Sequence, residues 1–157
     1  MILFRWREAI PAVRPCWSLQ STRKSRWSGH PKAEIRREAG NRVRSVVNGT
    51  VSTVAGDGTA GFKDGAAATA RFNLPRGIAV DSFGKIYVAD SFNYRVRVIS
   101  NGVVSTVAGD GVQGILDGAG TAARFFEPAS LAVSADGKTI YVGDEYGHRV
   151  RVISVGP

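Results

Sequence analysis

Glycine and aspartate gather twice in this 157-residue sequence, in a pattern that invites a phosphate-binding or calcium-binding interpretation. The two stretches are Ala55–Gly65 and Ala108–Gly118. A phosphate-binding loop needs a Gly-Lys-Ser or Gly-Lys-Thr ending and a following helix, and neither stretch supplies them. An EF-hand calcium loop needs D-x-D-x-D-G spacing, which these stretches also lack. We therefore predict no metal and no cofactor here, and we expect the aspartates to cap turns.

Arginine recurs at equivalent places along the chain, and its chemistry suits an anionic ligand. Three pairs repeat, namely Arg42/Arg44, Arg95/Arg97 and Arg149/Arg151. Stacked on one another they would form a basic ladder to which RNA or another anion would bind. The alternative is structural pairing with Asp90, Asp144 or Glu145, or a solvated outer strand. We favour the structural interpretation, because a scaffold requires recurrence in every repeat and aromatic residues for base stacking are few.

A further arginine recurs in the tripeptide Ala-Arg-Phe, as Arg71 and Arg124. A buried ion pair with Asp64 or Asp117, or hydrogen bonds to loop carbonyls, would explain why it is kept in both copies.

Catalytic residues have little support in the sequence. Residues 41–157 contain one histidine, His148, at a position that Tyr94 occupies in the other copy. A single imidazole without partners is more often a turn residue than a ligand, and no Ser-His-Asp set can be assembled. We therefore predict that the chain is not an enzyme.

All these residues belong to a repeat with an offset of 53 positions. Val51–Pro75 returns as Val104–Pro128, and the first eight residues of the two copies are identical. A period of this size indicates repeated supersecondary units. Because both copies keep the same residue types, we expect a structural role in joining the units. The residues concerned are Gly56, Gly58, Asp64, Gly65, Arg71, Phe72, Gly109, Gly111, Asp117, Gly118, Arg124 and Phe125.

Short strands lie between the Gly-rich stretches. Hydrophobic alternation and β-branched runs predict strands at Gly77–Asp81, Ile86–Ala89, Arg95–Ser100 and Val103–Ala108. Asn101-Gly102, and Asn48-Gly49 in an earlier partial copy, are strong signals for hairpin turns. Four antiparallel strands joined by tight turns make a small sheet whose two apolar faces need neighbours. We therefore predict an all-β fold in which such sheets are the blades of a β-propeller.

The repeat resembles the NHL repeat family. The residues that carry the resemblance are Ala55-Gly56-Asp57-Gly58, Asp64-Gly65, Ala70-Arg71-Phe72, Pro75, Gly77-Ile78-Ala79-Val80-Asp81, Tyr87-Val88-Ala89-Asp90 and Asn93–Arg97. The second copy departs from the pattern at Ser130, Gly147-His148 and Phe126-Glu127. The resemblance covers residues 42–154 and implies an NHL-type β-propeller, in which members of the family close with about six blades.

Assigning the predicted strands to blades divides residues 41–157 into one full blade and two incomplete blades. We expect a partial propeller over residues 41–157, with a half blade at 42–55, a full blade at 76–108 and a three-strand blade at 129–154. An unclosed array leaves its terminal faces and edges exposed. We therefore expect a fragment, a truncated gene model, or a piece that associates with further blades or with itself.

Residues 1–40 differ from the repeats and hold nine Lys or Arg residues against three acidic ones. This composition favours a basic, poorly ordered tail, and it also fits an organelle transit peptide. A short helix is expected from Pro31 to Ala39. Cys16 is the only cysteine, which excludes an intrachain disulfide. We find no apolar run long enough for a membrane span and no secretory signal, which favours an intracellular location.

The leading functional prediction is a non-catalytic binding or scaffold module, and the favoured partner is another protein. The resemblance implies that partners dock on loops at the blade ends, where segments such as Asn73–Arg76 and Phe126–Ala129 differ between copies. Candidate binding residues are Phe62, Lys63, Arg76, Phe92 and Tyr146, with Arg95, Arg97, Arg149 and Arg151 for an anionic partner. The resemblance also implies two alternatives. One is RNA binding on a basic face, and the other is a fragment of a metal-dependent propeller lyase or lactonase, which would need several histidine ligands.

Overall fold

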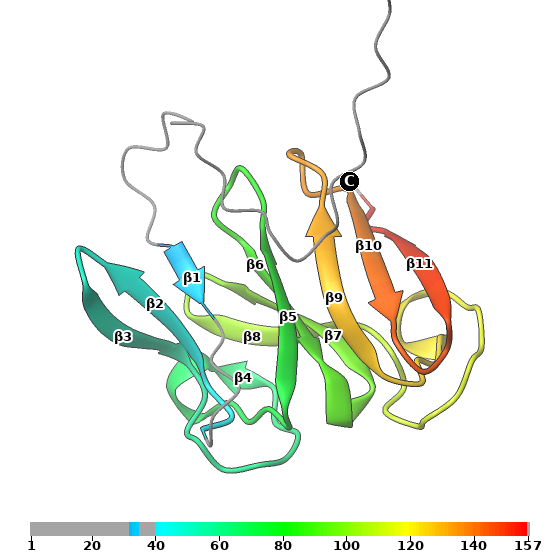
Figure 1. Cartoon of the computed structure of the whole chain (residues 1–157), viewed down its shortest axis with the longest axis horizontal. Coiled ribbons are helices and arrows are strands. Elements are labelled where there is room, and N and C mark those ends of the chain that lie inside the picture. The colour runs from blue at the N-terminus through cyan, green and yellow to red at the C-terminus, as the bar shows by residue number, and fades with distance from the viewer. Residues whose placement is uncertain (1–31, 35–39, 157) are drawn as a thin grey trace, which may run out of the picture.

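Three antiparallel sheets stand side by side in the computed structural model, which describes residues 32–34 and 40–156 (Figure 1). The first sheet contains β1 (Lys32–Glu34), β2 (Val43–Val47) and β3 (Thr50–Ala55). The second contains β4 (Gly65–Ala66), β5 (Pro75–Val80), β6 (Ile86–Asp90), β7 (Arg95–Ser100) and β8 (Val103–Ala108). The third contains β9 (Pro128–Val133), β10 (Thr139–Asp144) and β11 (Arg149–Ser154). Three short 3-10 turns complete the described part: η1 (Ala67–Thr69), η2 (Ser91–Asn93) and η3 (Gly120–Ala122).

The predicted all-β architecture and hairpin turns are confirmed. Strands β7 and β8 have the predicted bounds, and the Asn101-Gly102 turn joins them with φ values of 50° and 74°. Asn48-Gly49 joins β2 and β3 in the same way, with φ values of 49° and 81°. Positive φ at both central residues is what a two-residue type I′ turn requires, which explains the Asn-Gly pairs.

The second sheet has five strands rather than the predicted four. The additional strand, β4, comes from the Gly-rich stretch, which was expected to serve only as a connection. Gly65 and Ala66 pair with Val104 and Val103 on the outer edge of β8. Ala67 N then donates to Gly102 O at 2.8 Å. The connection thus satisfies backbone groups that an edge strand would leave unpaired.

The first sheet corrects a second expectation. Lys32–Glu34, predicted as part of a helix over 31–39, is the strand β1 and pairs with Arg44–Val46 of β2. A strand edge that can be paired outweighs the weak local helix signal. The rest of that predicted helix lies outside the described residues. So does most of the tail or transit peptide predicted for residues 1–40, of which the structure describes residues 32–34 and 40.

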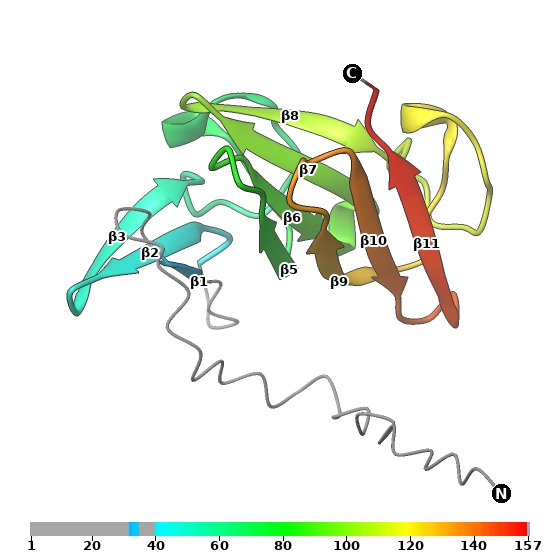
Figure 2. The same ribbon diagram turned by 90° about the horizontal axis from the view of Figure 1, so that it is seen from above.

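Apolar side chains from neighbouring sheets meet in two cores. One contains Phe72, Val43 and Val88, and lies between the first and second sheets. The other contains Phe125 and Ile140, and lies between the second and third sheets. Phe72 and Phe125 are equivalent residues of the two repeats. Strands β5 and β9 lie side by side where these sheets meet (Figure 2). Each sheet is therefore stabilised by its neighbour, which is the burial expected of propeller blades.

The repeated Gly-Asp-Gly loop connects one sheet to the next and packs closely against neighbouring backbone. Gly56 has a φ of +106°, and a Cβ added there would lie 2.6 Å from Asn41 O. Its N–H donates to Ala67 O at 2.8 Å. Gly109 makes the equivalent bond to Gly120 O at 3.2 Å. A side chain at Gly56 would be strained by the backbone conformation and by the contact, so the glycine is structurally required.

Arg97 is a buried charged residue that connects several parts of the second sheet. Its side chain is 0% exposed, and its Nη1 lies 2.7 Å from Asp90 Oδ2. Its Nε and Nη2 both contact Asp64 Oδ1, at 2.9 and 2.5 Å. Two backbone carbonyls, Arg71 O and Lys63 O, accept its remaining donors at 3.2 and 2.9 Å. The guanidinium thus ties β6, β7 and the Gly-rich stretch together.

Asp90 is as fully buried as Arg97. Besides Arg97, it accepts hydrogen bonds from Asn73 N and Asn93 Nδ2, both at 2.8 Å. Burial raises the pKa of Asp90, and the hydrogen bonds from Asn93, Asn73 and Arg97 oppose that rise. A buried ion pair whose partner is removed leaves an uncompensated charge, which costs far more than the loss of an exposed pair.

We predict that Asp90→Asn lowers the free energy of unfolding by about 3–5 kcal/mol, because Arg97 loses its buried counter-charge. Urea unfolding followed by circular dichroism measures the change. Asp136→Asn is the matched control, since Asp136 lies on an exposed turn, and we expect it to stay within about 0.5 kcal/mol. A loss below about 1 kcal/mol for Asp90→Asn would contradict the role given to this pair.

The arginine of each Ala-Arg-Phe tripeptide pairs with a different aspartate from the one predicted. Arg71 Nε donates to Asp57 Oδ2 at 2.8 Å, and Arg124 Nε donates to Asp110 Oδ2 at 2.6 Å. These pairs lie at the surface and are half-buried at most, rather than fully buried as predicted. Asp64 is unavailable to Arg71 because Arg97 binds it. The Arg71 hydrogen bond, with a smaller contribution from Thr59 N, lowers the pKa of Asp57 below its ordinary value of 3.8.

The lowered pKa of Asp57 predicts a defined pH dependence. The ion pair contributes stability above pH 3.8 and loses it as the pH falls through the folded-state pKa. We expect Arg71→Met to move the pKa of Asp57 up towards 3.8, measured by NMR titration of the side-chain carboxyl groups. Asp110, held by Arg124 in the other repeat, is the internal control and should not move. Asp57 titrating at its ordinary pKa in the unmodified protein would exclude the pairing.

Candidate functional site

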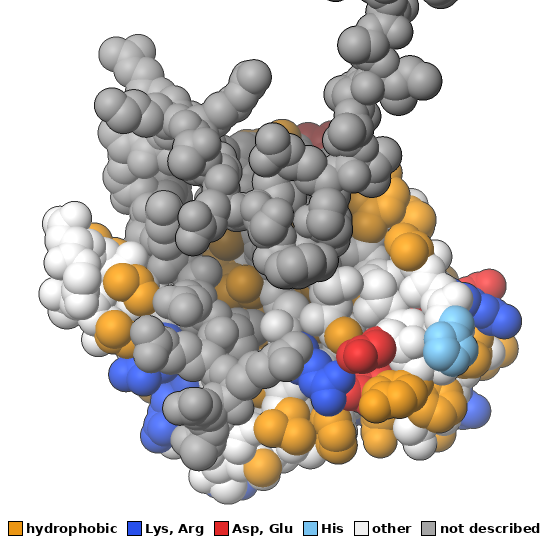
Figure 3. Space-filling model, viewed as in Figure 1, with side chains coloured by type: hydrophobic (Ala, Val, Ile, Leu, Met, Phe, Trp, Pro, Cys, Tyr) orange, Lys and Arg blue, Asp and Glu red, His pale blue; other side chains and the backbone are white. Residues whose placement is uncertain are grey.

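Three of the predicted binding residues come together in one pocket between the second and third sheets. We call it the junction pocket, and its volume is about 310 Å³. It is lined by Arg76, Phe92, Tyr94, Gln113, Phe126, Glu127 and Tyr146. Figure 3 shows apolar, acidic and basic side chains side by side along the lower edge of the molecule.

Separate elements supply the walls of the junction pocket. Arg76 lies on β5, Phe92 lies in η2, and Tyr146 follows β10. Glu127 comes directly before β9, and its N–H donates to Asp144 Oδ1 at 2.7 Å. Because β5 and β9 are neighbours, residues from both repeats meet here. The pocket therefore exists only at the junction of two sheets.

Aromatic rings and one cation shape the interior of the junction pocket. Arg76 Cζ lies 5.7 Å from the centre of the Phe92 ring. The rings of Phe126 and Tyr146 have centres 6.2 Å apart and are tilted by 41°. Both Phe92 and Tyr146 remain exposed. Exposed aromatic residues and arginine are the types that are enriched at protein interfaces.

The acidic side of the junction pocket is formed by two carboxylates that share one cation. Arg76 forms ion pairs with Glu127 Oε1 and with Glu145 Oε2, the latter at 2.9 Å. Glu127 is only 7% exposed, so Arg76 supplies the counter-charge of a buried carboxylate. The Glu145 side chain is 57% exposed, so its carboxylate is accessible to a donor from a partner.

Phe62 and Lys63 do not reach the junction pocket. The Phe62 ring lies under two guanidinium groups, 3.9 Å from Arg95 Cζ and 4.8 Å from Arg97 Cζ. Lys63 contributes its carbonyl oxygen to Arg97. Both residues therefore belong to the connection between the first and second sheets.

The arginine pairs do not form the accessible ladder that an RNA-binding surface would need. Arg97 is buried, so its proposed contact with an anionic partner is corrected: both faces of this strand are covered by neighbouring sheets. Arg95 donates to Asp110 O and Asn93 O, at 2.7 and 3.1 Å. Arg151 is held by Asp117 at 2.5 Å. Of the four arginines suggested for an anionic partner, only Arg149 is classed as exposed.

Among residues 32–34 and 40–156, no group of three or more His, Cys, Asp or Glu side chains is placed to bind a metal ion. The one histidine among these residues, His148, has a φ of 50°, and the equivalent Tyr94 has a φ of 53°. The same conformation at both places is that of a turn residue. None of the described helices is long and apolar enough to cross a membrane.

Glu145, Tyr94 and Gln113 complete the surroundings of the junction pocket but were not among the predicted residues. A signal for all three was present in the sequence. Glu145 stands where the first repeat has Ser91, Gln113 stands where it has Ala60, and Tyr94 stands where the second repeat has His148. These positions therefore differ between copies, as do those of Phe92 and Tyr146.

Comparison with known proteins agrees with this architecture. The Teneurin NHL domain family matches residues 30–116. NHL repeat-containing protein 2 of Gallus gallus is 32% identical over 99 residues, which is 60% of this chain and 14% of that protein. Protein SUPPRESSOR OF QUENCHING 1, chloroplastic, of Arabidopsis thaliana is 32% identical over 97 residues, or 60% of this chain and 9% of that protein. The chain thus spans a small part of these relatives.

Solved structures show the same fold. A protein of unknown function from Bacteroides thetaiotaomicron has a TM-score of 0.72 at 25% identity, over 79% of this chain and 32% of its own. An auxiliary nutrient binding protein from Bacteroides ovatus has a TM-score of 0.66 at 26% identity, over 80% of this chain and 35% of its own. These likenesses are to NHL-repeat and β-propeller proteins. With a family match over more than half of its length, the chain belongs to the Teneurin NHL domain family.

Proposed function

We propose that this chain is a non-catalytic protein-binding module whose partner docks at the junction pocket. The observation that carries the proposal is a pocket between two repeats that contains Arg76 and is rimmed by exposed aromatic side chains, with the exposed carboxylate of Glu145 paired to Arg76. This carboxylate favours a partner that supplies a donor, for example a lysine, an arginine or a backbone N–H.

The aromatic residues define the rest of the partner. Phe92, Phe126 and Tyr146 offer apolar faces in the same pocket, so an apolar side chain next to the donor would pack among them. Anchors of this kind contribute most of the affinity in protein interfaces. The composition of the pocket thus favours a peptide segment that combines one donor group with one apolar side chain.

Comparison of the two repeats supports the same location. The shared glycines, aspartates and arginines make contacts that connect sheets, as Arg97 does with Asp64. The residues around the junction pocket are those that differ between copies. Variation in loops carried by a constant scaffold is where recognition is expected. The relatives named above are proteins of the same repeat type, and they support a binding role without naming a partner for this chain.

Selection of binding peptides from a displayed library on the purified 157-residue chain tests this proposal. We expect selected peptides to lose at least about tenfold in affinity on Tyr146→Ala and on Glu145→Gln, measured by titration calorimetry. The first change removes an aromatic anchor, and the second removes the charge of the exposed carboxylate. Circular dichroism verifies that each variant is folded.

Phe83→Ala is the matched control. Phe83 is 73% exposed and lies on the turn between β5 and β6, at the opposite end of this hairpin from Arg76 and Phe92. We expect it to leave peptide affinity unchanged. The proposal fails if no selected peptide depends on Tyr146 or Glu145, or if Phe83→Ala weakens binding equally. Binding of RNA that weakens steeply with salt and is lost on Arg149→Ala would favour the anionic-partner alternative instead.

A further inference from the structure

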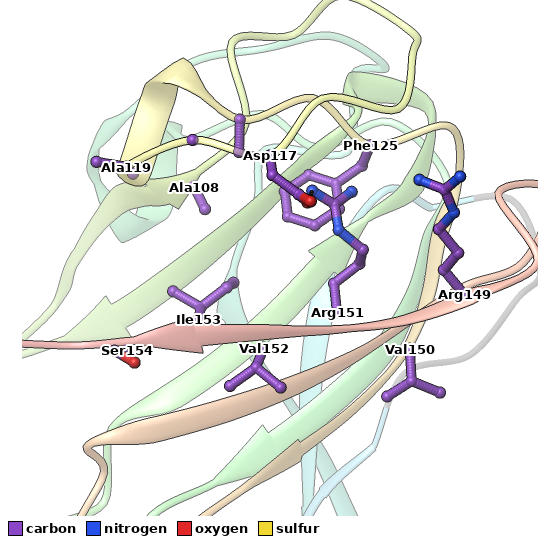
Figure 4. A pocket seen from close by; sticks show the side chains of 13 residues that line it. Ala108, Asp117, Ala119, Phe125, Arg149, Val150, Arg151, Val152, Ile153 and Ser154 are labelled. Carbon is purple, nitrogen blue, oxygen red and sulfur yellow. Dashed lines mark hydrogen bonds and ion pairs between the residues drawn. The ribbon is translucent and has the colours of Figure 1, made fainter.

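A second and larger cavity, of about 790 Å³, runs along the outer edge of β11 (Figure 4). We call it the edge slot. One wall is the strand Arg149–Ser154, and the opposite wall is Asp117–Gly120. In Figure 4, Arg151 and Ile153 point from β11 towards the opposite wall, whereas Val150 and Val152 point away from it. Phe125 lies at the base of the slot.

The second sheet has the same two walls, and there a strand fills the space between them. The walls are β7 and the two-residue strand β4, which correspond to β11 and Gly118-Ala119 in the sequence repeat. Strand β8 lies between them and pairs with both. Within the described part of the third sheet, the order is β11-β10-β9, so no strand occupies the position of β8. The edge slot therefore has the form of a strand-binding site.

Side-chain exposure shows what β8 covers. In the second sheet, Thr106 Oγ1 of β8 donates to Asp64 Oδ2 at 2.8 Å, and the Asp64 side chain is 37% exposed. The equivalent Asp117 also binds an arginine but receives no such hydroxyl, and its side chain is 88% exposed. Ile99, next to β8, is buried, whereas the equivalent Ile153 is only half-buried. The walls of the slot thus expose the groups that a strand would cover.

We propose that the edge slot binds one extended peptide strand with the chemistry of β8, namely uncharged, β-branched and hydroxyl-bearing residues as in Val-Val-Ser-Thr-Val-Ala. The strand runs antiparallel to β11, as β8 runs antiparallel to β7. Its backbone pairs with the outer edge of β11 and adds a strand to the sheet. The slot is distinct from the junction pocket and shares no lining residue with it.

The pairing of β7 with β8 in the second sheet predicts the register of the bound strand on β11. Ile99 is opposite Val104, and Arg97 is opposite Thr106. In the edge slot, the second valine of the bound strand therefore faces Ile153, and its threonine faces Arg151. This register brings the threonine hydroxyl to Asp117, as Thr106 is brought to Asp64. A proline at the serine or threonine position would remove a backbone donor and weaken the pairing.

A labelled synthetic peptide with the sequence of residues 102–110 tests the proposal on the 157-residue chain. Fluorescence anisotropy should show saturable binding at one peptide per chain. The same peptide with Ser105→Pro and Thr106→Pro should bind at least about tenfold more weakly, because it lacks backbone donors for pairing. Hydrogen exchange should slow at the amides of Arg149–Ser154 when the unmodified peptide is bound.

A double-mutant cycle tests the proposed register. Asp117→Asn in the protein and Thr106→Val in the peptide should each weaken binding several-fold, and together they should weaken it by less than the product of the two effects. Asp117 is highly exposed, so the variant is expected to fold. Asp136→Asn, on an exposed turn of the same sheet, is the matched control, and Tyr146→Ala should leave this peptide's affinity unchanged.

Three results would overturn the proposal. The first is the absence of saturable binding. The second is binding that Asp117→Asn and the proline peptide leave unchanged, or that protects amides away from β11. The third is a chain that is already dimeric in sedimentation, with the amides of β11 protected before peptide is added. That outcome would assign the slot to a second copy of the chain rather than to a separate peptide.

Discussion

The second sheet depends on one buried cation. The guanidinium of Arg97 is removed from water, and that removal is tolerated only because two carboxylates and two carbonyls surround it. Satisfying these donors fixes where the Gly-rich stretch lies against β7. That placement in turn brings β4 to the edge of β8 and Phe72 into the core between the sheets. Arg151 has the equivalent place in the third sheet, with Asp117 and Leu116 O as partners, so the same constraint acts twice.

The sequence predicted the strands and hairpins because their signals are local: alternation, β-branched runs and Asn-Gly turns. It also named Asp90 as a partner for the paired arginines, and Arg97 binds it. It could not assign the partner of Arg71, since Asp57 and Asp64 both lie within reach of an arginine by sequence spacing, and only the folded loop decides between them. For Arg95 and Arg97 the sequence left open an accessible basic ladder and favoured structural pairing. Neighbouring sheets cover both faces, and Arg97 is buried as a result.

The junction pocket was only partly predictable for a different reason. Comparing the copies identified Arg76, Phe92 and Tyr146 as positions that vary, but these residues are up to 70 positions apart in the chain. Only the packing of β5 against β9 brings them together, and it adds Tyr94 and Glu145, which had not been selected. The constant residues of the repeat thus build the scaffold, and the variable residues occupy the surface where two repeats meet.

The identity of β3 and β8 over Val-Ser-Thr-Val-Ala has a consequence for the folding process. Each of these strands is preceded by an Asn-Gly turn and, further back, by the tripeptide Arg-Val-Arg, so local sequence distinguishes poorly between correct and crossed hairpins. Exchange of equivalent strands between repeats is a characteristic error of repeat proteins. Correct pairing is favoured by the short chain connection within each hairpin, which closes faster than a loop of some fifty residues. The tight turns therefore favour formation of the correct hairpins during folding, and they also fix the geometry of those hairpins.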